Sequence, residues 1–353
     1  MNNYLIKHDK INKFITKILT IFNIPKRDRE LLCKSLIGSS LRGVDSHGIR
    51  LFPLYVKHLE FGSIKKKPNM TFAKKMPAVG LLNADNGFGH VAGYLANKEA
   101  IKIAKKTGVG IVGIINSTHY GASGAYSVDI AEKNYIGLSF THSDAIAIPH
   151  NGNQPFHGTN PYSFSAPLKN KKPLLVDFAT TSIPFNKVLR ARNNNTKLEK
   201  DLALDKNGKM TRNANLAESL YPLGGKLFGH KGFGLSSSIE VLCGPFLGIA
   251  HGFRILSMLG PDLASYRGLG HFTMAININA ITSKKKYFSL INTYINDLQK
   301  QKSNKNKILY PGEKEWKEEK IRKKKGIPFD KELINSFLEL DQKFSLNYFT
   351  KLT

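Results

Sequence analysis

Apolar residues recur at helical spacing in the first part of the chain. Residues 8–42 predict two helices, of which the second starts with a proline and ends near a glycine. A third helix is expected from about Leu51, after a short polar, turn-like segment. Lysines interrupt the apolar positions near the N-terminus, so the continuous apolar stretch of a secretory signal is not expected there.

The middle of the chain alternates between short apolar runs and helical patterns. Strands are expected in residues 79–83, 109–116, 135–143, 173–180 and 270–280. Helices are expected in residues 93–108, 124–134 and, beginning near Lys231, 230–249. The polar, Asn- and Lys-rich residues 190–215 predict a long surface excursion. This alternation of strands and helices favours the α/β class.

The two ends of the chain are helical and charged, and they suggest how the domains are organised. We expect the N- and C-terminal helices to pack together as a discontinuous helical and dimerisation domain of residues 1–75 with 280–353. Residues 76–279 would then form an α/β cofactor- and substrate-binding region, which is either undivided or made of two subdomains.

The glycines Gly108, Gly110 and Gly113 have the spacing of a dinucleotide-binding fingerprint. In that fingerprint the glycines follow a strand and open a helix, so that the helix N-terminus faces the pyrophosphate. Here the order is reversed, because a predicted helix precedes the glycines and a predicted strand follows them. We therefore interpret Gly108 as the end of a helix and predict no Rossmann loop at this position.

Composition and net charge exclude only a few classes of protein. The chain has 353 residues, of which 41% are hydrophobic, and the cysteines Cys33 and Cys243 lie far apart. No apolar run is long enough for a membrane span, and we expect a reduced, cytoplasmic protein without a disulfide framework. The net charge of +27 would suit nucleic acid, but the basic residues are spread out and lack interleaved aromatic residues. We therefore do not expect nucleic acid to be the main partner.

Four short segments carry candidate chemistry. His119 follows a buried strand, where ligand sites of α/β sheets lie, and a histidine there can move a proton near neutral pH. The segment DSHGIR brings His47 and Arg50 close together, although it also suits a helix-capping turn. Glycines around Lys231 at a helix start suit a phosphate, and Asp177 ends a strand. The histidines lack metal-binding spacing, so we predict no catalytic metal.

Seven segments in one order carry a family resemblance: DSHGIR, ADNGFGHVAG, STHYGASGAY, HGTNP, VDFATT, GHKGFGLSSSIEVLCG and YPGE. No single segment is specific, but the ordered set resembles the malate/L-lactate dehydrogenase family, across residues 10–330. This is the second, non-Rossmann type, which includes ureidoglycolate, L-sulfolactate and 2,3-diketo-L-gulonate oxidoreductases. The resemblance implies a mixed sheet, an intertwined homodimer, NAD or NADP as cofactor, and hydride transfer to or from a small 2-hydroxy or 2-oxo acid.

The resemblance also implies roles for individual residues. His119 is expected to accept the proton of the substrate hydroxyl, with His47 as the other acid–base candidate and Arg50 as the carboxylate clamp. The expected cofactor contacts are Ser143, Asp177, Phe178, Ala179, Lys231, Gly312 and Glu313. Many members place the arginine one position later, where this chain has Leu51. The alternative is a catalytically silent relative, or a basic nucleic-acid-binding protein on the same scaffold.

Overall fold

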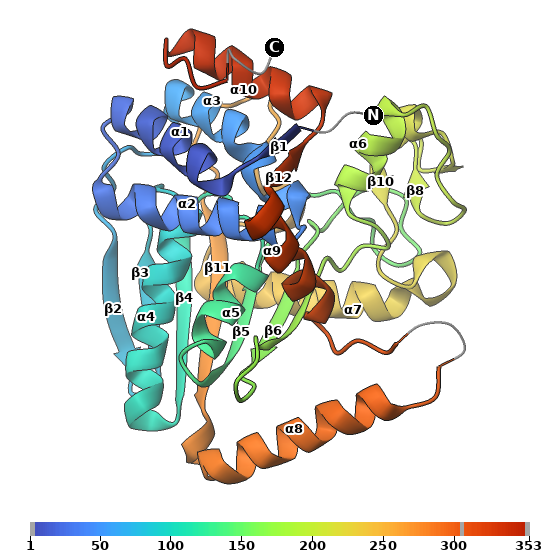
Figure 1. Ribbon diagram of the computed structural model, residues 1–353. Helices are drawn as coiled ribbons and strands as arrows, with labels where there is room; N and C mark the ends of the chain where they lie inside the picture. Colours follow the sequence, from blue (N-terminus) through green and yellow to red (C-terminus); the bar gives the residue numbers. More distant parts are fainter. Residues whose placement is uncertain (1–3, 304–306, 350–353) are drawn as a thin grey trace.

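The computed structural model describes residues 4–303 and 307–349, in which a mixed sheet is covered by helices (Figure 1). The sheet has the strand order β2-β3-β4-β11-β5-β6-β7. Its strands are β2 (Thr71–Met76), β3 (Val79–Asn83), β4 (Val109–Ser117), β5 (Tyr135–Thr141), β6 (Tyr162–Ala166), β7 (Leu174–Phe178) and β11 (Leu269–Asn277). Only β3 and β4 pair in parallel, so the α/β class and the mixed sheet expected from the sequence are confirmed.

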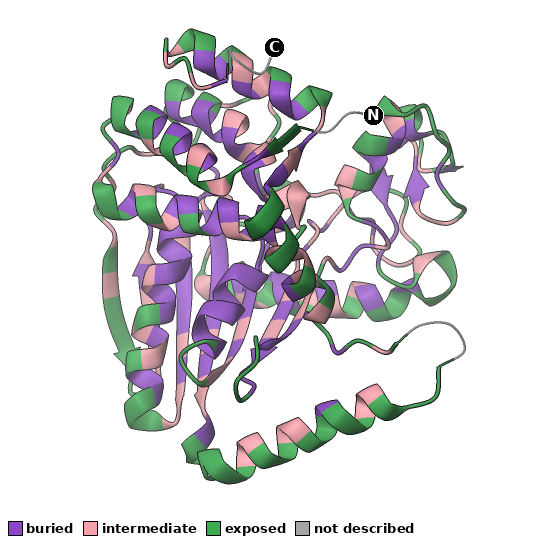
Figure 2. Cartoon of the chain, in the orientation of Figure 1, coloured by how far each residue is buried: buried purple, intermediate pink, exposed green. Residues whose placement is uncertain are grey.

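Helices cover both faces of this sheet. The α-helices of the described residues are α1 (His8–Ile21), α2 (Lys26–Leu41), α3 (Phe52–Phe61), α4 (Gly89–Thr107), α5 (Gly124–Ala131), α6 (Phe185–Asn193), α7 (Gly225–Cys243), α8 (Lys284–Lys300), α9 (Glu313–Lys325) and α10 (Lys331–Lys343). α4 and α5 pack on one face and α7 packs on the other (Figure 1). The central strands are therefore buried on both sides, which explains their nearly continuous β-branched sequences (Figure 2).

A layer of helices from both ends of the chain lies across one edge of the sheet (Figure 1). α1, α2, α3 and α10 share one hydrophobic core, in which Phe14, Phe52 and Phe337 are completely buried. Strands β1 (Tyr4–Ile6) and β12 (Ile327–Phe329) pair antiparallel and hold the two chain ends together. The helical pattern of residues 8–42 thus produced the two predicted helices.

Two elements within the expected terminal segments pack elsewhere. β2 belongs to the large sheet, where it pairs with β3. α8 lies along the opposite end of the molecule and is largely exposed (Figures 1 and 2). Its Ile295 packs in a separate core with Leu174 and Trp316. The division into residues 1–75 with 280–353 and residues 76–279 stays a prediction, in which β2 and α8 are the two elements that contact the α/β region.

Residues 190–215 differ from the surface excursion that their composition predicts. Together with α6 they build a small lobe around a three-stranded sheet of β8 (Ala203–Leu204), β9 (Met210–Thr211) and β10 (Ser219–Leu220). A few apolar residues among the polar ones, including Val188, Leu198 and Leu220, form its core.

Gly108 ends a helix, as the order of the elements predicts. It caps the C-terminus of α4 with a φ of 85°, and β4 follows directly. The prediction that this glycine spacing is not a Rossmann loop is therefore confirmed. Within the described residues, no helix is long and apolar enough to cross a membrane.

Candidate active site

The termini of five strands meet at one edge of the large sheet. β4, β5 and β7 end there, while β6 and β11 begin there, as the strand pairing requires. His119 follows β4, Ser143 follows β5, and Arg267 precedes β11. Residues that are far apart in the sequence are thus brought together beneath the helical layer.

A cavity of about 740 Å³ opens at this edge of the sheet. It is lined by residues of the strand ends, by the two short 3-10 helices of residues 45–51, by α6 and by the beginning of α10. His119, His47 and Arg50, which sequence reasoning assigned to catalysis, all line it. The volume is within the range typical of small-molecule sites.

The segment that carries His47 is held by a buried arginine from α9. Arg322 forms an ion pair with Asp45 at 2.5 Å and also donates to the carbonyl oxygen of Ser40 at 2.7 Å. A Cβ atom on Gly48 would lie 2.1 Å from the Ser40 hydroxyl, so this tight turn requires glycine. Asp45 and Ser46 therefore do not cap a helix with their side chains; Asp45 instead anchors the turn that presents His47.

The His119 ring is held by contacts to one of its two nitrogens. Its Nδ1 atom lies 2.7 Å from the hydroxyl of Tyr55 on α3 and 3.3 Å from the backbone nitrogen of Gly121. The His47 and His119 rings are stacked with their centroids 5.7 Å apart. Because Nδ1 is engaged with the protein, Nε2 is the nitrogen of His119 that is left for a ligand in the cavity.

Burial keeps both imidazoles uncharged near neutral pH. It lowers the pKa of His47 to about 4. Burial also lowers the pKa of His119 well below its usual range, and His47, His90 and Arg267 add to that effect. A neutral imidazole can accept a proton, and the nearby second ring disfavours double protonation. The pair is therefore suited to handling one proton at a time.

A third histidine, His90, packs against Tyr55 and His119. It is completely buried on α4, and its ring meets Tyr55 edge-on with centroids 5.0 Å apart. Neither of its ring nitrogens has a hydrogen-bond partner among the described residues. Burial lowers its pKa to about 3, so His90 adds a neutral ring to the cluster. Leaving a buried polar atom unpaired costs about 1–3 kcal/mol, which is tolerated more readily at functional sites than elsewhere.

Arg50 lies at the rim of the cavity with its charge already paired. Its guanidinium contacts Asp330 at 2.5 Å and Glu332 at 3.5 Å, both at the beginning of α10. Asn193 of α6 donates to the same Glu332 oxygen at 3.2 Å. A substrate carboxylate that reaches Arg50 must therefore compete with these acidic side chains.

Four of the expected cofactor contacts line the same cavity: Ser143, Asp177, Phe178 and Ala179. Burial raises the pKa of Asp177 to about 6, and the backbone N–H of Gly124 opposes this rise. The backbone approaches so closely that a Cβ atom on Gly124 would lie 2.5 Å from the Asp177 carboxylate. This donor and acceptor set, beside a large cavity, fits a nicotinamide cofactor.

The other three expected cofactor contacts lie outside the lining of this cavity in the described chain. Lys231 is exposed, and its ammonium lies over the Phe228 ring at 5.8 Å. Our prediction that it stands at a helix start is wrong, because α7 already begins at Gly225. Gly312 packs on Leu175, and Glu313 pairs with Lys317 at 2.9 Å.

Sequence reasoning missed several residues of the site. Tyr55 is part of a helix of mixed composition, and nothing in that helix marks its hydroxyl. Asp330 and Glu332 lie far from Arg50 in the sequence, so only the fold reveals their contact. Asp144 could have been found from the sequence, since it is a charged residue that directly follows the predicted strand of residues 135–143.

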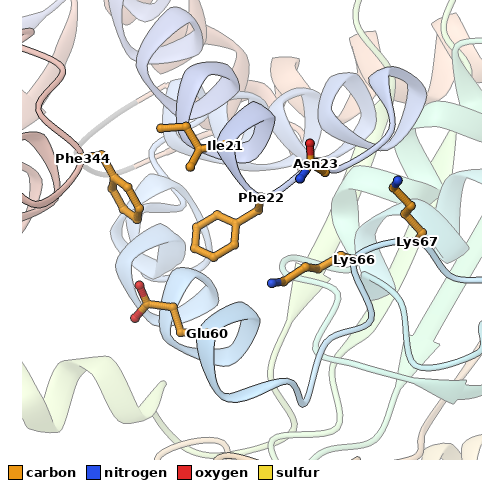
Figure 3. Close-up of a pocket in the computed structure, with 7 residues that line it drawn as sticks. All are labelled: Ile21, Phe22, Asn23, Glu60, Lys66, Lys67 and Phe344. Carbon is orange, nitrogen blue, oxygen red and sulfur yellow. The ribbon is translucent and has the colours of Figure 1, made fainter.

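A second hollow of about 550 Å³ lies near the turn between α1 and α2 (Figure 3). Phe22 and Phe344 meet there with their rings 5.7 Å apart, and the Lys66 ammonium lies 5.3 Å from the Phe22 centroid. Glu60 is paired with Lys343 at 2.6 Å. This hollow contains no histidine, so the acid–base chemistry is assigned to the larger cavity.

Comparison with known proteins agrees with the fold. The family model described as malate/L-lactate dehydrogenase matches residues 6–338. The malate dehydrogenase of Pyrococcus abyssi is 34% identical, over 96% of this chain and 94% of its own length. The NAD(+)-dependent ureidoglycolate dehydrogenase of Escherichia coli is 29% identical, over 98% of both chains. The crystal structure of malate dehydrogenase from Entamoeba histolytica has a TM-score of 0.92 and 27% identity, and covers 98% of this chain and 99% of its own.

The mixed sheet is that of a dehydrogenase of the non-Rossmann type. The chain belongs to the malate/L-lactate dehydrogenase family. It is an NAD(P)-dependent oxidoreductase that transfers a hydride between the nicotinamide and a small 2-hydroxy or 2-oxo acid. The family and the fold expected from the ordered motifs are thereby confirmed.

Proposed function

We propose that His119 accepts the hydroxyl proton of a 2-hydroxy acid while Arg50 holds the substrate carboxylate. The observation that carries this proposal is the placement of His119, His47 and Arg50 around one cavity, with the two rings stacked. The bound nicotinamide supplies the hydride acceptor. Nε2 of His119 takes the proton in the tautomer whose Nδ1–H donates to the Tyr55 hydroxyl, and that contact also fixes the ring orientation. His47 is the second acid–base group beside it.

Arg50 suits a carboxylate because its planar guanidinium can form two parallel hydrogen bonds. The side chains of its present partners are 44% exposed for Asp330 and 66% exposed for Glu332, so a substrate carboxylate can compete with both. Fixing the carboxylate at the rim would leave the neighbouring hydroxyl carbon directed inward, towards His119. Every small 2-hydroxy acid has this carboxylate and hydroxyl. Selection among such acids must therefore come from residues elsewhere in the cavity that contact the remaining substituent.

For the cofactor we propose NAD, held by Ser143 and by residues 177–179. The support comes from the Escherichia coli relative, whose name specifies NAD(+). The net charge of +27 would also tolerate the 2′-phosphate of NADP, so both forms need to be compared. Titration of protein fluorescence with NADH and NADPH at one ionic strength tests this choice, and tighter binding of NADPH would contradict it.

We further propose a homodimer in which a second copy covers the outer side of α7. This helix exposes Leu227 and Val241, and the 3-10 helices that follow expose Phe246 and Phe253. Exposed apolar side chains of this size are typical of protein contacts. Lys231 lies on the same helix, so its expected cofactor contact would depend on the dimer. Sedimentation equilibrium should give twice the chain mass, and Val241→Asp should halve it; Ile281→Asp is the control on another exposed apolar residue.

The direct test of the proposed activity is a screen of 2-oxo acids with NADH and NADPH. Reduction of at least one acid, lost in His119→Ala, supports the assignment. Absence of turnover in the unaltered protein, together with salt-dependent retention on DNA at saturating NADH, would favour the basic nucleic-acid-binding alternative.

A further inference from the structure

An ion pair lies at the cavity wall next to the cofactor residue Ser143. Asp144 lines the cavity, and its carboxylate pairs with Arg267, which directly precedes β11. Arg267 also donates through Nε to the carbonyl oxygen of Leu256 at 2.8 Å. The second oxygen of Asp144 accepts the backbone N–H of Met258 at 3.2 Å, and Met258 lines the cavity as well.

The two charges are not equally accessible. The Arg267 side chain is only 5% exposed, whereas that of Asp144 is 28% exposed. A ligand in the cavity therefore meets the carboxylate first, and the guanidinium lies behind it. The Nη1 atom of Arg267 is buried and has no hydrogen-bond partner among the described residues. Arg267 thus retains hydrogen-bonding capacity that Asp144 alone does not use.

The carboxylate of this pair lines the same cavity as the proton-transfer residues. Arg267 contributes, after burial and the neighbouring histidines, to the lowered pKa of His119. Its positive charge also opposes the rise in the pKa of Tyr55 that burial causes, and the Tyr55 hydroxyl contacts His119. A 2-hydroxy acid held by Arg50 and His119 would leave its third substituent free to meet Asp144. A negative group placed there would face a carboxylate at short range, which is strongly unfavourable away from bulk water.

We propose that Asp144, held in place by Arg267, is a specificity-determining residue that selects against substrates with a second anionic group. It favours an uncharged end that can donate a hydrogen bond to the carboxylate, such as an amide. Selection works through repulsion of the wrong substrate as much as through attraction of the right one. This inference rests on the proposed function of the same cavity.

The ion pair predicts the effect of removing each charge. Asp144→Asn leaves the Arg267 charge without its partner, so the wall becomes positive and should attract a second carboxylate. The double variant Asp144→Asn with Arg267→Gln removes both charges, so it should discriminate little between charged and neutral ends. The double variant has no unpaired buried arginine, so its folding should be less affected. It can therefore be measured even if the single variant does not fold.

The experiment compares oxaloacetate with its neutral isostere, the 4-amide 2-oxosuccinamate, in NADH- or NADPH-dependent reduction. The unaltered protein should have the higher kcat/KM for the amide. Asp144→Asn should shift the ratio at least tenfold towards oxaloacetate, and the double variant should fall between the two. Asp297→Asn, the same change at an exposed position on α8, should leave the ratio unchanged.

Each result decides between the possibilities. A preference of the unaltered protein for oxaloacetate, or an unchanged ratio in both folded variants, would overturn the role of Asp144 while leaving the dehydrogenase activity intact. If the unaltered protein reduces no 2-oxo acid with either cofactor, the proposed function fails and this inference fails with it.

Discussion

The inner wall of the cavity and its rim differ in the charge of their functional side chains. At the inner wall, His119, His47 and Tyr55 are enclosed, and burial keeps the two imidazoles uncharged. At the rim, Arg50 carries a permanent charge that Asp330 and Glu332 neutralise. The proposed proton transfer therefore depends on histidine pKa values that burial lowers. Carboxylate binding depends instead on ion-pair partners of Arg50 that a substrate can replace.

The largest effect is expected at the inner wall. His119→Ala removes the proposed proton acceptor and should lower kcat by roughly 10²–10⁴-fold, the usual contribution of general acid–base catalysis. The Kd for NADH should change little, because Ser143 and residues 177–179 are intact. His8→Ala in α1, outside the cavity lining, is the control. Turnover at the unaltered rate would show that another group takes the proton.

At the rim, the expected loss is in binding. Arg50→Lys keeps the charge but cannot form two parallel hydrogen bonds, so KM for the 2-oxo acid should rise roughly 10- to 100-fold with a smaller change in kcat. Steady-state kinetics at saturating cofactor measure both constants. Arg27→Lys, in an ion pair on α2, controls for the substitution itself. An unchanged KM would place the carboxylate elsewhere.

The buried histidines also predict how stability depends on pH. The usual histidine pKa is 6.5, but in the folded chain it is about 4 for His47 and about 3 for His90. Between these values the unfolded chain binds more protons, so the free energy of unfolding should fall as the pH drops below 6.5. Asp177, with its pKa raised to about 6, opposes this trend for one group only.

Urea unfolding at pH 7.5, 6.0 and 5.0 measures that trend. The midpoint should decrease steadily towards pH 5, and His90→Phe should reduce the slope because one buried titrating group is removed. Midpoints that stay constant over this range would mean that the histidines are as accessible in the folded chain as in the unfolded one.

The smallest effect is expected from removing the ion pair between Arg50 and Glu332 at the rim. Glu332→Gln removes one competitor for Arg50 and weakens the contact with Asn193. Since exposed ion pairs contribute about 0.2–1 kcal/mol, KM for the 2-oxo acid should fall by about two- to fivefold. Glu339→Gln, on the same helix, is the matched control. A higher KM would mean that Glu332 helps to bind the substrate.

The parts of this comparison that could be predicted from the sequence are local. The position of His119 after a β-branched run follows from residues 109–116, and the end of α4 at Gly108 follows from the order of neighbouring elements. Ordered motifs then identified the family. These predictions succeed because a strand and its following loop are determined largely by adjacent residues.

The rest depends on contacts between distant segments. The pairing of Arg50 with Asp330 spans 280 positions, and that of Asp144 with Arg267 spans 123. No local pattern encodes such contacts. The prediction that Lys231 stands at a helix start is wrong because α7 already begins at Gly225, which places the lysine inside the helix.

The pH dependence of kcat/KM for oxidation of a 2-hydroxy acid tests the central claim most directly, namely that burial provides an uncharged imidazole as the proton acceptor. Because burial lowers the pKa of His119, the activity should persist as the pH falls through 6.5 and decline only well below it. A decline centred at pH 6.5 or higher, in a protein that remains folded, would contradict the account.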